Sequence, residues 1–233
     1  MRALGGEPIG PALRMPNFRA LVGEAGWDEL PAAVQARFDA AAHERPRVYP
    51  GVMEVRASRF GRLIAQLCRL FGTPLAPWRG RDVAVAVLTW PAAAGGLVWD
   101  RTYAFEGREP ITITSTKVMT RDGRLLEVAM GGLGMRLTAG VEAGALVFRS
   151  CGYFWRVAGV RLPIPALMTP GSALIIHRDE GAGAFTFSMR FVHALAGETF
   201  FQEGRFRDPA ARMLEASQPA AAAPAEPPLG RAA

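Results

Sequence analysis

The sequence predicts a mainly β domain of the α+β class, an antiparallel up-and-down β-barrel or half-barrel with two N-terminal helices. Half of the 233 residues are apolar, which is enough to bury one sizeable core. From residue 82 to residue 206, short stretches of alternating polar and apolar residues follow one another, with glycine-rich turns between them. Few helical segments remain to cover such a sheet, so the sheet must curl to bury its apolar face.

The chain is predicted to hold one folded domain between two poorly ordered ends. Residues 1–26 combine glycine and proline without sustained periodicity, and residues 208–233 form an Ala/Pro-rich tail. Residues 27–207 form the domain itself, a helix-capped antiparallel β-barrel whose length is common for a single domain.

Two helices are predicted before the strands. The first covers about residues 31–43, where apolar residues recur three or four positions apart and Pro31 suits a first helical turn. The second begins at its cap Ser58 and ends before Gly72. One of its faces is apolar and the opposite face is basic, which is typical of a solvated helix or of a helix lying on an anionic membrane. The apolar stripe is Phe60, Ile64, Leu67 and Phe71, and the basic face is Arg59, Arg62, Gln66 and Arg69.

Nine strands are predicted after Pro77, and neighbours in sequence are expected to pair. The apolar stretch 83–99 contains Pro91 and a Gly-Gly pair, which favours two strands over one spanning helix, so no transmembrane segment is expected. Residues 159–169 hold prolines that cannot donate backbone hydrogen bonds, and they are predicted to form a loop or lid over the barrel. The predicted strands cover residues 82–90, 97–105, 111–119, 124–130, 133–140, 144–156, 172–178, 184–193 and 198–206.

The strand 97–105 carries the main candidate for a binding group. Alternation places Trp99, Arg101 and Tyr103 on one face, and the aromatic side chains indicate that this face is buried. A buried guanidinium needs either a carboxylate partner or an anionic ligand. The candidate partners are Glu127 and Glu203. An ion pair between Arg101 and either glutamate would stabilise the barrel and have no functional role.

The strand 184–193 has the most regular alternation in the chain. Its apolar face consists of Phe185, Phe187, Met189 and Phe191, which form either plain core or the wall of an apolar cavity.

Composition and motifs exclude several function classes. The chain has 26 arginines, one lysine and a net charge of +6, but no repeated Arg-aromatic cluster that would stack on nucleic acid. The two cysteines and the lack of a secretory leader favour a cytoplasmic location. The three histidines have no metal-ligand spacing, no serine lies in a nucleophile elbow, and Gly131 to Gly134 join two strands. No metal, cofactor or catalytic residue is therefore predicted.

Several segments together carry a family resemblance. The most specific are the Trp-x-Arg-x-Tyr pattern at 99–103 and the Leu-Pro-x-Pro pattern at 162–165, beside the second helix, Gly131 to Gly134 and the closing strand. Together they resemble the bacterial domain of unknown function numbered 4166. The closing strand departs from the family, which tends to have Tyr-x-Gly where this chain has Phe201-Gln-Glu-Gly204. The resemblance implies that members occur alone or behind a saccharopine-dehydrogenase-like NAD-binding domain, and it implies no activity.

The leading hypothesis is a broadly lipocalin-like barrel that binds a hydrophobic small molecule, either neutral or acidic, without catalysis; an acidic group would be a partner for Arg101. An accessory module for a separate NAD-dependent oxidoreductase is one alternative, which follows from the resemblance. An enzyme with an inward Arg/Glu acid–base pair is another. Peripheral membrane contact through the second helix stays open. The candidate ligand-binding residues are Trp99, Arg101, Tyr103, Glu127, Phe185, Phe187, Met189, Phe191 and Glu203.

Overall fold

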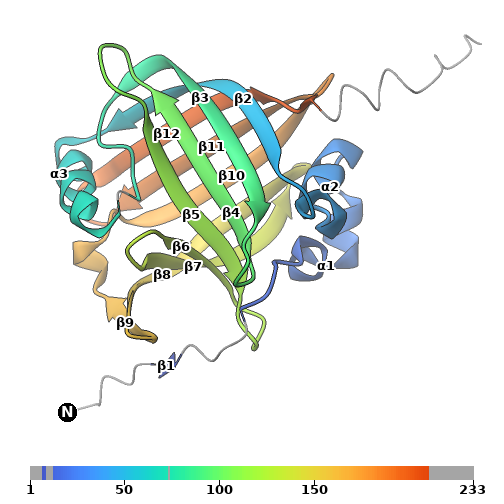
Figure 1. Ribbon diagram of the computed structural model, residues 1–233, viewed down its shortest axis with the longest axis horizontal. Coiled ribbons are helices and arrows are strands. Elements are labelled where there is room, and N and C mark those ends of the chain that lie inside the picture. The colour runs from blue at the N-terminus through green and yellow to red at the C-terminus, as the bar shows by residue number, and fades with distance from the viewer. Residues whose placement is uncertain (1–6, 9–12, 73, 210–233) are drawn as a thin grey trace, which may run out of the picture.

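The computed structural model describes residues 7–8, 13–72 and 74–209. Within these residues ten strands form a closed antiparallel barrel (Figure 1), so the predicted fold class is confirmed. Neighbours follow the order β8-β10-β11-β12-β2-β3-β4-β5-β6-β7, and pairing of β7 with β8 closes the circle. The barrel strands are β2 (Arg47–Ala57), β3 (Gly80–Pro91), β4 (Leu97–Ala104), β5 (Ile111–Met119), β6 (Leu125–Ala129), β7 (Leu133–Glu142), β8 (Ala145–Val157), β10 (Ser172–Gly181), β11 (Ala184–His193) and β12 (Gly197–Arg207).

Strand β2 was not predicted, because it lies between the two predicted helices and contains Pro50 and Gly51, which disfavour strands. Gly51 pairs with Phe206 of β12, and a Cβ atom on Gly51 would lie 2.4 Å from the Phe206 ring. Gly51 therefore weakens the strand pattern in the sequence, but its lack of a side chain leaves room for the Phe206 ring in the core. This contact is made between residues far apart in the chain, so the local pattern does not contain it.

One end of the barrel is covered by α1 (Phe18–Asp28), α2 (Ala32–Phe38) and the short 3-10 helix η1 (Ala40–His43). Helix α1 corrects the prediction that residues 1–26 are poorly ordered, for the part from residue 13 onward. Asn17 accepts a hydrogen bond from the backbone of Ala20 and so caps the helix. Phe18 and Trp27 are buried, while Gly23 is non-helical (φ 75°) and breaks the periodicity.

The predicted helix over residues 31–43 is split into α2 and η1 at Asp39. Its backbone is extended (ψ 149°), and its side chain accepts a hydrogen bond from Ala41 to begin η1. Residues 1–6, 9–12 and 210–233 lie outside the described part of the chain, so the prediction of a poorly ordered tail over residues 208–233 falls almost wholly on residues that are not described.

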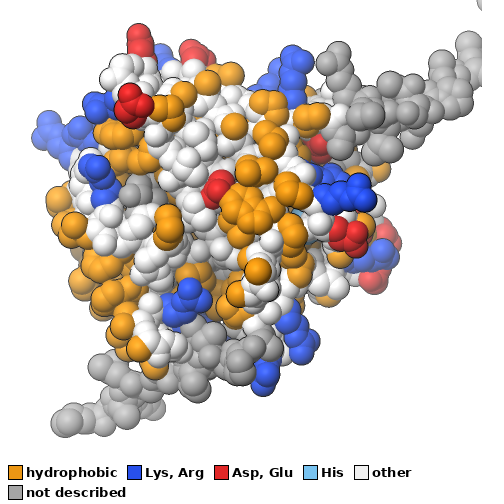
Figure 2. All heavy atoms as spheres, in the orientation of Figure 1, with side chains coloured by type: hydrophobic (Ala, Val, Ile, Leu, Met, Phe, Trp, Pro, Cys, Tyr) orange, Lys and Arg blue, Asp and Glu red, His pale blue; other side chains and the backbone are white. Residues whose placement is uncertain are grey.

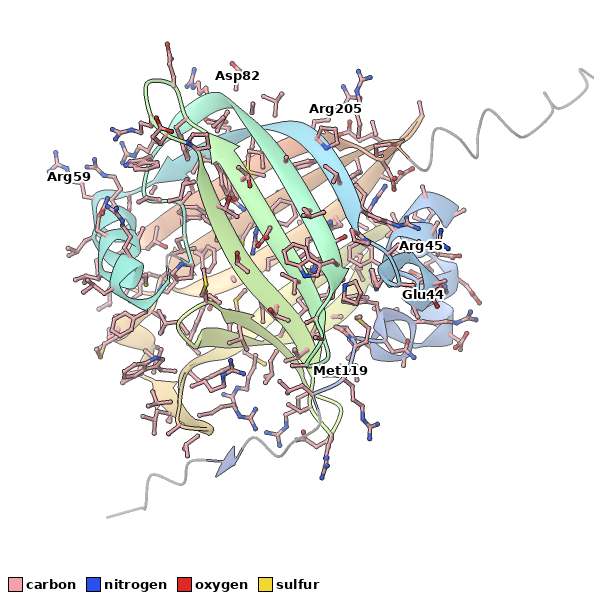
Figure 3. The ribbon with its side chains drawn as sticks, in the orientation of Figure 1. Glu44, Arg45, Arg59, Asp82, Met119 and Arg205 are labelled. Carbon is pink, nitrogen blue, oxygen red and sulfur yellow. The ribbon has the colours of Figure 1, made fainter. Side chains whose placement is uncertain are left out.

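The opposite end carries α3 (Arg59–Cys68) and the 3-10 helix η2 (Arg69–Phe71), as predicted for the second helix. In Figure 3, Arg59 of α3 and Arg45 next to η1 lie at opposite ends of the barrel. The buried face of α3 differs from the predicted stripe, because Gly61 and Ala65 are buried while Leu67 is exposed. A Cβ atom on Gly61 would lie 1.8 Å from the carbonyl oxygen of Thr199, so glycine lets α3 pack directly on β12.

We expect Gly61→Ala to lower the free energy of unfolding by about 1–3 kcal/mol, because the new methyl group forces α3 away from β12. Urea unfolding measured by circular dichroism checks this value. Gly140→Ala is the matched control, since a Cβ atom there meets nothing within 4 Å, and its effect should stay within about 0.5 kcal/mol. Equal stability of the two variants would contradict the tight α3 packing.

Residues 159–169, predicted as a loop, instead contain β9 (Val160–Ile164) and the 3-10 helix η3 (Ala166–Met168). Strand β9 pairs with the second half of β8 and, on its other side, with β1 (Glu7–Pro8). The prolines are tolerated because β9 lies outside the barrel, near the edge of the sheet. No helix within the described residues is long and apolar enough to span a bilayer.

Candidate functional site

Four polar side chains form a cluster inside the barrel: Arg101 on β4, Ser115 and Lys117 on β5, and Glu127 on β6. Antiparallel pairing places Lys117 directly opposite Glu127, so the positions of these side chains follow from the strand register. Glu127 is the centre of the cluster. Its Oε2 lies 3.0 Å from Nζ of Lys117, and its Oε1 lies 3.4 Å from Nη2 of Arg101. The Ser115 hydroxyl donates to the same Oε1 at 2.7 Å and accepts from Arg101.

The cluster is buried and carries a surplus of one positive charge. Arg101, Lys117 and Glu127 are each less than 9% exposed. Burial by itself would raise the pKa of Glu127, but Lys117, Arg101 and the Ser115 hydrogen bond outweigh it and bring the pKa to about 2. Burial also lowers the pKa of Lys117, and Glu127 opposes this shift. Glu127 is therefore a carboxylate at neutral pH, facing the guanidinium of Arg101 and the amino group of Lys117.

A cavity of about 130 Å³ lies between this cluster and the end of the barrel that carries α3. Arg101, Ser115 and Glu127 supply its polar wall, and most of the remaining wall is apolar. A second space of about 20 Å³ extends on the other side of Arg101 and Glu127. Most of the barrel interior is thus filled by side chains. The apolar wall of the larger cavity includes Ile64, Leu75, Ala129, Leu133, Met135, Ile164, Met168, Met189 and Phe191.

Several buried nitrogen atoms of the interior have no hydrogen-bond partner among the described residues. They include Nε of Arg101, Nε1 of Trp99, Nδ1 of His177 and Nε2 of Gln202. Buried polar atoms are normally hydrogen-bonded, so such groups call for a partner that the chain does not supply. Arg101 is the one among them that also borders the 130 Å³ cavity.

The predicted ligand-binding residues are distributed over three environments. Arg101, Glu127, Met189 and Phe191 line the larger cavity. Trp99, Phe185 and Phe187 line the smaller one, which they share with Arg101 and Glu127. Tyr103 lines neither cavity, and its buried hydroxyl donates to Oε1 of Gln202 at 3.0 Å.

The prediction that Glu203 points into the barrel is wrong. On β12 the side chains of Phe200, Gln202 and Phe206 are buried, and Glu203 between them is exposed. Aromatic residues occur on both faces of this strand, since Phe201 points outward and lies under Arg56, with 4.2 Å from Cζ to the ring centroid. Because both faces carry aromatic side chains, the sequence pattern does not show which face of β12 points into the barrel. Gln202 occupies the interior position instead.

Sequence reasoning missed Ser115 and Lys117, although the signal was present. Lys117 is the only lysine in the chain, and it follows Ile113 and Ser115 on alternate positions of a strand whose opposite face is mostly threonine. That parity places Lys117 on the apolar face. A lysine there is unusual and indicates a buried partner.

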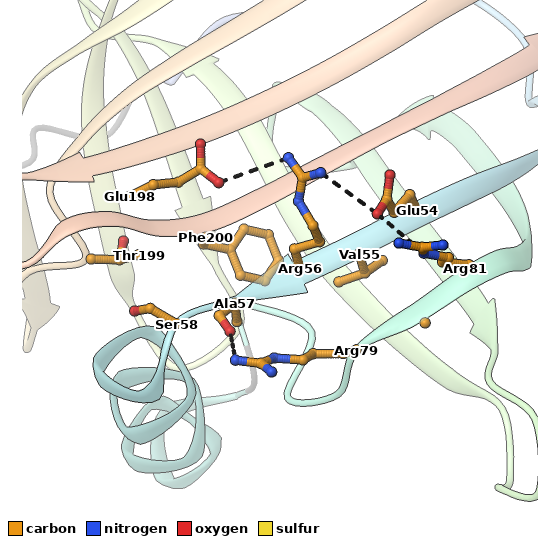
Figure 4. A pocket seen from close by; sticks show the side chains of 11 residues that line it. Glu54, Val55, Arg56, Ala57, Ser58, Arg79, Arg81, Glu198, Thr199 and Phe200 are labelled. Carbon is orange, nitrogen blue, oxygen red and sulfur yellow. Dashed lines mark hydrogen bonds and ion pairs between the residues drawn. The ribbon is translucent and has the colours of Figure 1, made fainter.

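A wider hollow of about 540 Å³ lies on the outer surface beside β2, β3 and β12 (Figure 4). Four of its five charged side chains form ion pairs. Nη1 of Arg56 lies 3.6 Å from Oε1 of Glu54, its Nη2 lies 3.8 Å from Oε1 of Glu198, and Nε of Arg81 lies 3.8 Å from Oε1 of Glu54. Arg79 donates to the carbonyl of Ala57. Because these pairs are exposed to solvent, this surface is weaker than the interior cavity as a candidate ligand site.

No curated protein and no solved structure matches this chain. Residues 30–206 match the family described as Domain of unknown function (DUF4166), a region that runs from just before α2 to the penultimate residue of β12. This match covers well over half of the chain and includes the ten barrel strands except the last residue of β12. The chain therefore belongs to the DUF4166 family.

Proposed function

We propose that the barrel binds a compact small molecule with an apolar body and an acidic group, without catalysing a reaction. The observation that carries this proposal is the 130 Å³ cavity, whose apolar wall leads inward to Arg101. A ligand in this position buries its apolar body against Met189 and Phe191 and presents its acid to the guanidinium.

The charge of the cluster favours an anion. Glu127 balances only one of the two cations, Lys117 and Arg101, so a ligand carboxylate brings the buried charges to zero. Nε of Arg101 is buried without a hydrogen-bond partner among the described residues, and a carboxylate accepts well from a guanidinium. Both observations support an acid rather than a neutral apolar molecule.

The cavity volume limits the size of the ligand. About 130 Å³ is the share of about four water molecules in the liquid, and sites for drug-sized ligands usually exceed about 300 Å³. A short fatty acid or a single-ring acid matches this volume. A longer chain would have to displace part of the cavity wall, such as Met168 of η3.

The alternative functions have less support. An acid–base enzyme needs a group that exchanges protons near neutral pH, whereas Glu127 has a pKa of about 2 and Glu203 lies on the outer surface. The accessory role beside an NAD-dependent oxidoreductase gains no further support from the described residues.

Titration calorimetry with straight-chain acids from butanoate to decanoate, and with the matching alcohols, tests the proposal. We expect the shorter acids to bind and the alcohols to bind more weakly. Arg101→Gln should weaken the binding of the best acid by about tenfold to hundredfold, because one charge-assisted pair is lost. The fold should survive this change, since Lys117 and Glu127 remain as a neutral pair.

Two further variants sharpen the test. Ala129→Leu places a larger side chain in the cavity wall and should block every acid, with the charged cluster left intact. Arg121→Gln removes an exposed arginine at the opposite end and should bind like the wild type. The proposal fails if no acid binds, or if Arg101→Gln and Ala129→Leu leave the affinity unchanged.

A further inference from the structure

Five large apolar side chains stand exposed at the end of the barrel that carries α3. Leu63 is 56% exposed, Leu67 52% and Leu70 80%, and on η3 Leu167 is 63% and Met168 68% exposed. We call these five residues the mouth patch. Figure 2 shows hydrophobic side chains gathered at this end of the molecule. Contiguous exposed apolar surface of this kind marks an interaction site.

The mouth patch surrounds the entrance to the interior cavity. The cavity is lined by Ile64 and Cys68 of α3 on one side and by Met168 and Thr169 of the η3 region on the other. Leu63 and Leu67 lie on the same helix as the first pair, and Leu70 follows on η2. The two halves of the patch therefore belong to the two sides of one opening.

The spacing of Leu63, Leu67 and Leu70 indicates one apolar helix face rather than isolated exposed leucines. Leu63 and Leu67 lie four positions apart on one side of α3, and Leu70 follows three positions later on η2, which continues the helix. The opposite side of α3, with Gly61 and Ala65, is buried against the barrel. The helix is thus apolar on two faces, and the outer face has no partner among the described residues.

The charge around the mouth patch is positive. Arg59 and Arg62 are exposed, and neither forms an ion pair with a carboxylate in the described part of the chain. Arg69 is also exposed and donates to the amide oxygen of Gln66 at 3.0 Å. Elsewhere on the sheet, exposed Arg190 pairs with Glu198, whereas exposed Arg136 and Arg178 donate to backbone carbonyls. The surplus cations next to the leucines fit an anionic surface.

Aromatic residues adjoin the same face. The Phe71 and Trp155 rings meet edge to face at 5.2 Å between centroids, and Nε1 of Trp155 donates to the carbonyl of Gly131 at 3.0 Å. Tryptophan and arginine beside leucine form the composition that settles at the boundary between lipid headgroups and acyl chains.

We infer that this end of the barrel docks on a bilayer with anionic headgroups. The mouth patch enters the acyl boundary, Arg59 and Arg62 contact the headgroups, and the cavity entrance faces the lipid. This inference goes beyond the proposed ligand binding, and vesicle binding can be measured without any ligand.

Sedimentation of the full chain with phosphatidylcholine vesicles, with and without phosphatidylglycerol, tests the inference. We expect binding to the anionic vesicles, weakened by added salt. Arg59→Gln with Arg62→Gln should reduce this binding about thirtyfold, because each arginine near an anionic surface contributes roughly a fivefold factor. Leu63→Gln, Leu67→Gln and Leu70→Gln together should reduce it at least about tenfold.

Matched controls change the same residue types elsewhere. Arg45→Gln with Arg121→Gln alters the net charge equally at the opposite end, and Val48→Gln with Val52→Gln replaces exposed apolar residues on the outside of β2. Both controls should bind anionic vesicles like the wild type. All these positions are exposed, so the variants should fold, and circular dichroism checks this.

Three results would overturn the inference: no binding to either vesicle, equal loss in the controls, or unchanged binding in the leucine variant. If the protein does not bind vesicles but forms a dimer that Leu67→Gln dissociates, the mouth patch is a contact with a second copy of the chain instead. Vesicle binding without uptake of any acid would leave the docking intact and refute the ligand proposal.

Discussion

Glu127→Gln is expected to lower the free energy of unfolding by about 3–5 kcal/mol, because it removes the one carboxylate that balances two buried cations. Glutamine keeps the size and one acceptor oxygen, so the loss is electrostatic. Lys117 lies 4.7 Å from the centroid of the Trp99 ring, which offsets only part of the missing charge. Urea unfolding at neutral pH measures the change.

Three comparison variants separate this explanation from a general packing effect. Glu203→Gln makes the same chemical change on the outer surface and should stay within about 0.5 kcal/mol of the wild type. Arg101→Gln should cost less than Glu127→Gln, since it leaves a neutral pair. Replacing Arg101 and Lys117 with methionine and Glu127 with leucine together should recover much of the stability. Equal unfolding free energies for Glu127→Gln and Glu203→Gln would mean that water reaches the cluster.

The protein is expected to lose about 3 kcal/mol of stability between pH 6.5 and pH 4, through His43 alone. Burial lowers the pKa of His43 from 6.5 to about 4 in the folded state, although its contact with the Arg37 carbonyl opposes this. In this pH window the unfolded chain binds a proton that the folded chain does not, so stability falls as the pH falls. The full contribution of neutral His43 is present above pH 6.5.

His177 also makes the free energy of unfolding fall as the pH falls. It is buried among Phe38, Trp99 and Phe187, and burial together with nearby Lys117 lowers its pKa well below 6.5. The unfolding free energy, measured from above pH 6.5 to about pH 4, should therefore depend less on pH in His43→Gln and least in the variant that also carries His177→Gln. Identical pH profiles for the three proteins would show that the two histidines do not titrate on unfolding.

The sequence predicted the strands best where one face is apolar and the other polar. β5 and β11 begin and end at the predicted residues 111–119 and 184–193. Alternation is local, because successive side chains of a strand point to opposite faces whatever lies around them. The same property places Arg101 inside the barrel, and it also indicates the interior position of Lys117, which sequence reasoning overlooked.

By itself, then, the sequence determined the barrel class, most of the strands and the inward direction of Arg101, since these depend on neighbours within a few residues. Only the tertiary structure decided that Glu127 rather than Glu203 meets Arg101, that Gly51 lets β2 complete the barrel beside Phe206, and that Leu67 faces outward. The tertiary structure also decided the volume of the cavity. The physical reason is that strand register and packing join residues many positions apart, and a local pattern carries no record of those contacts.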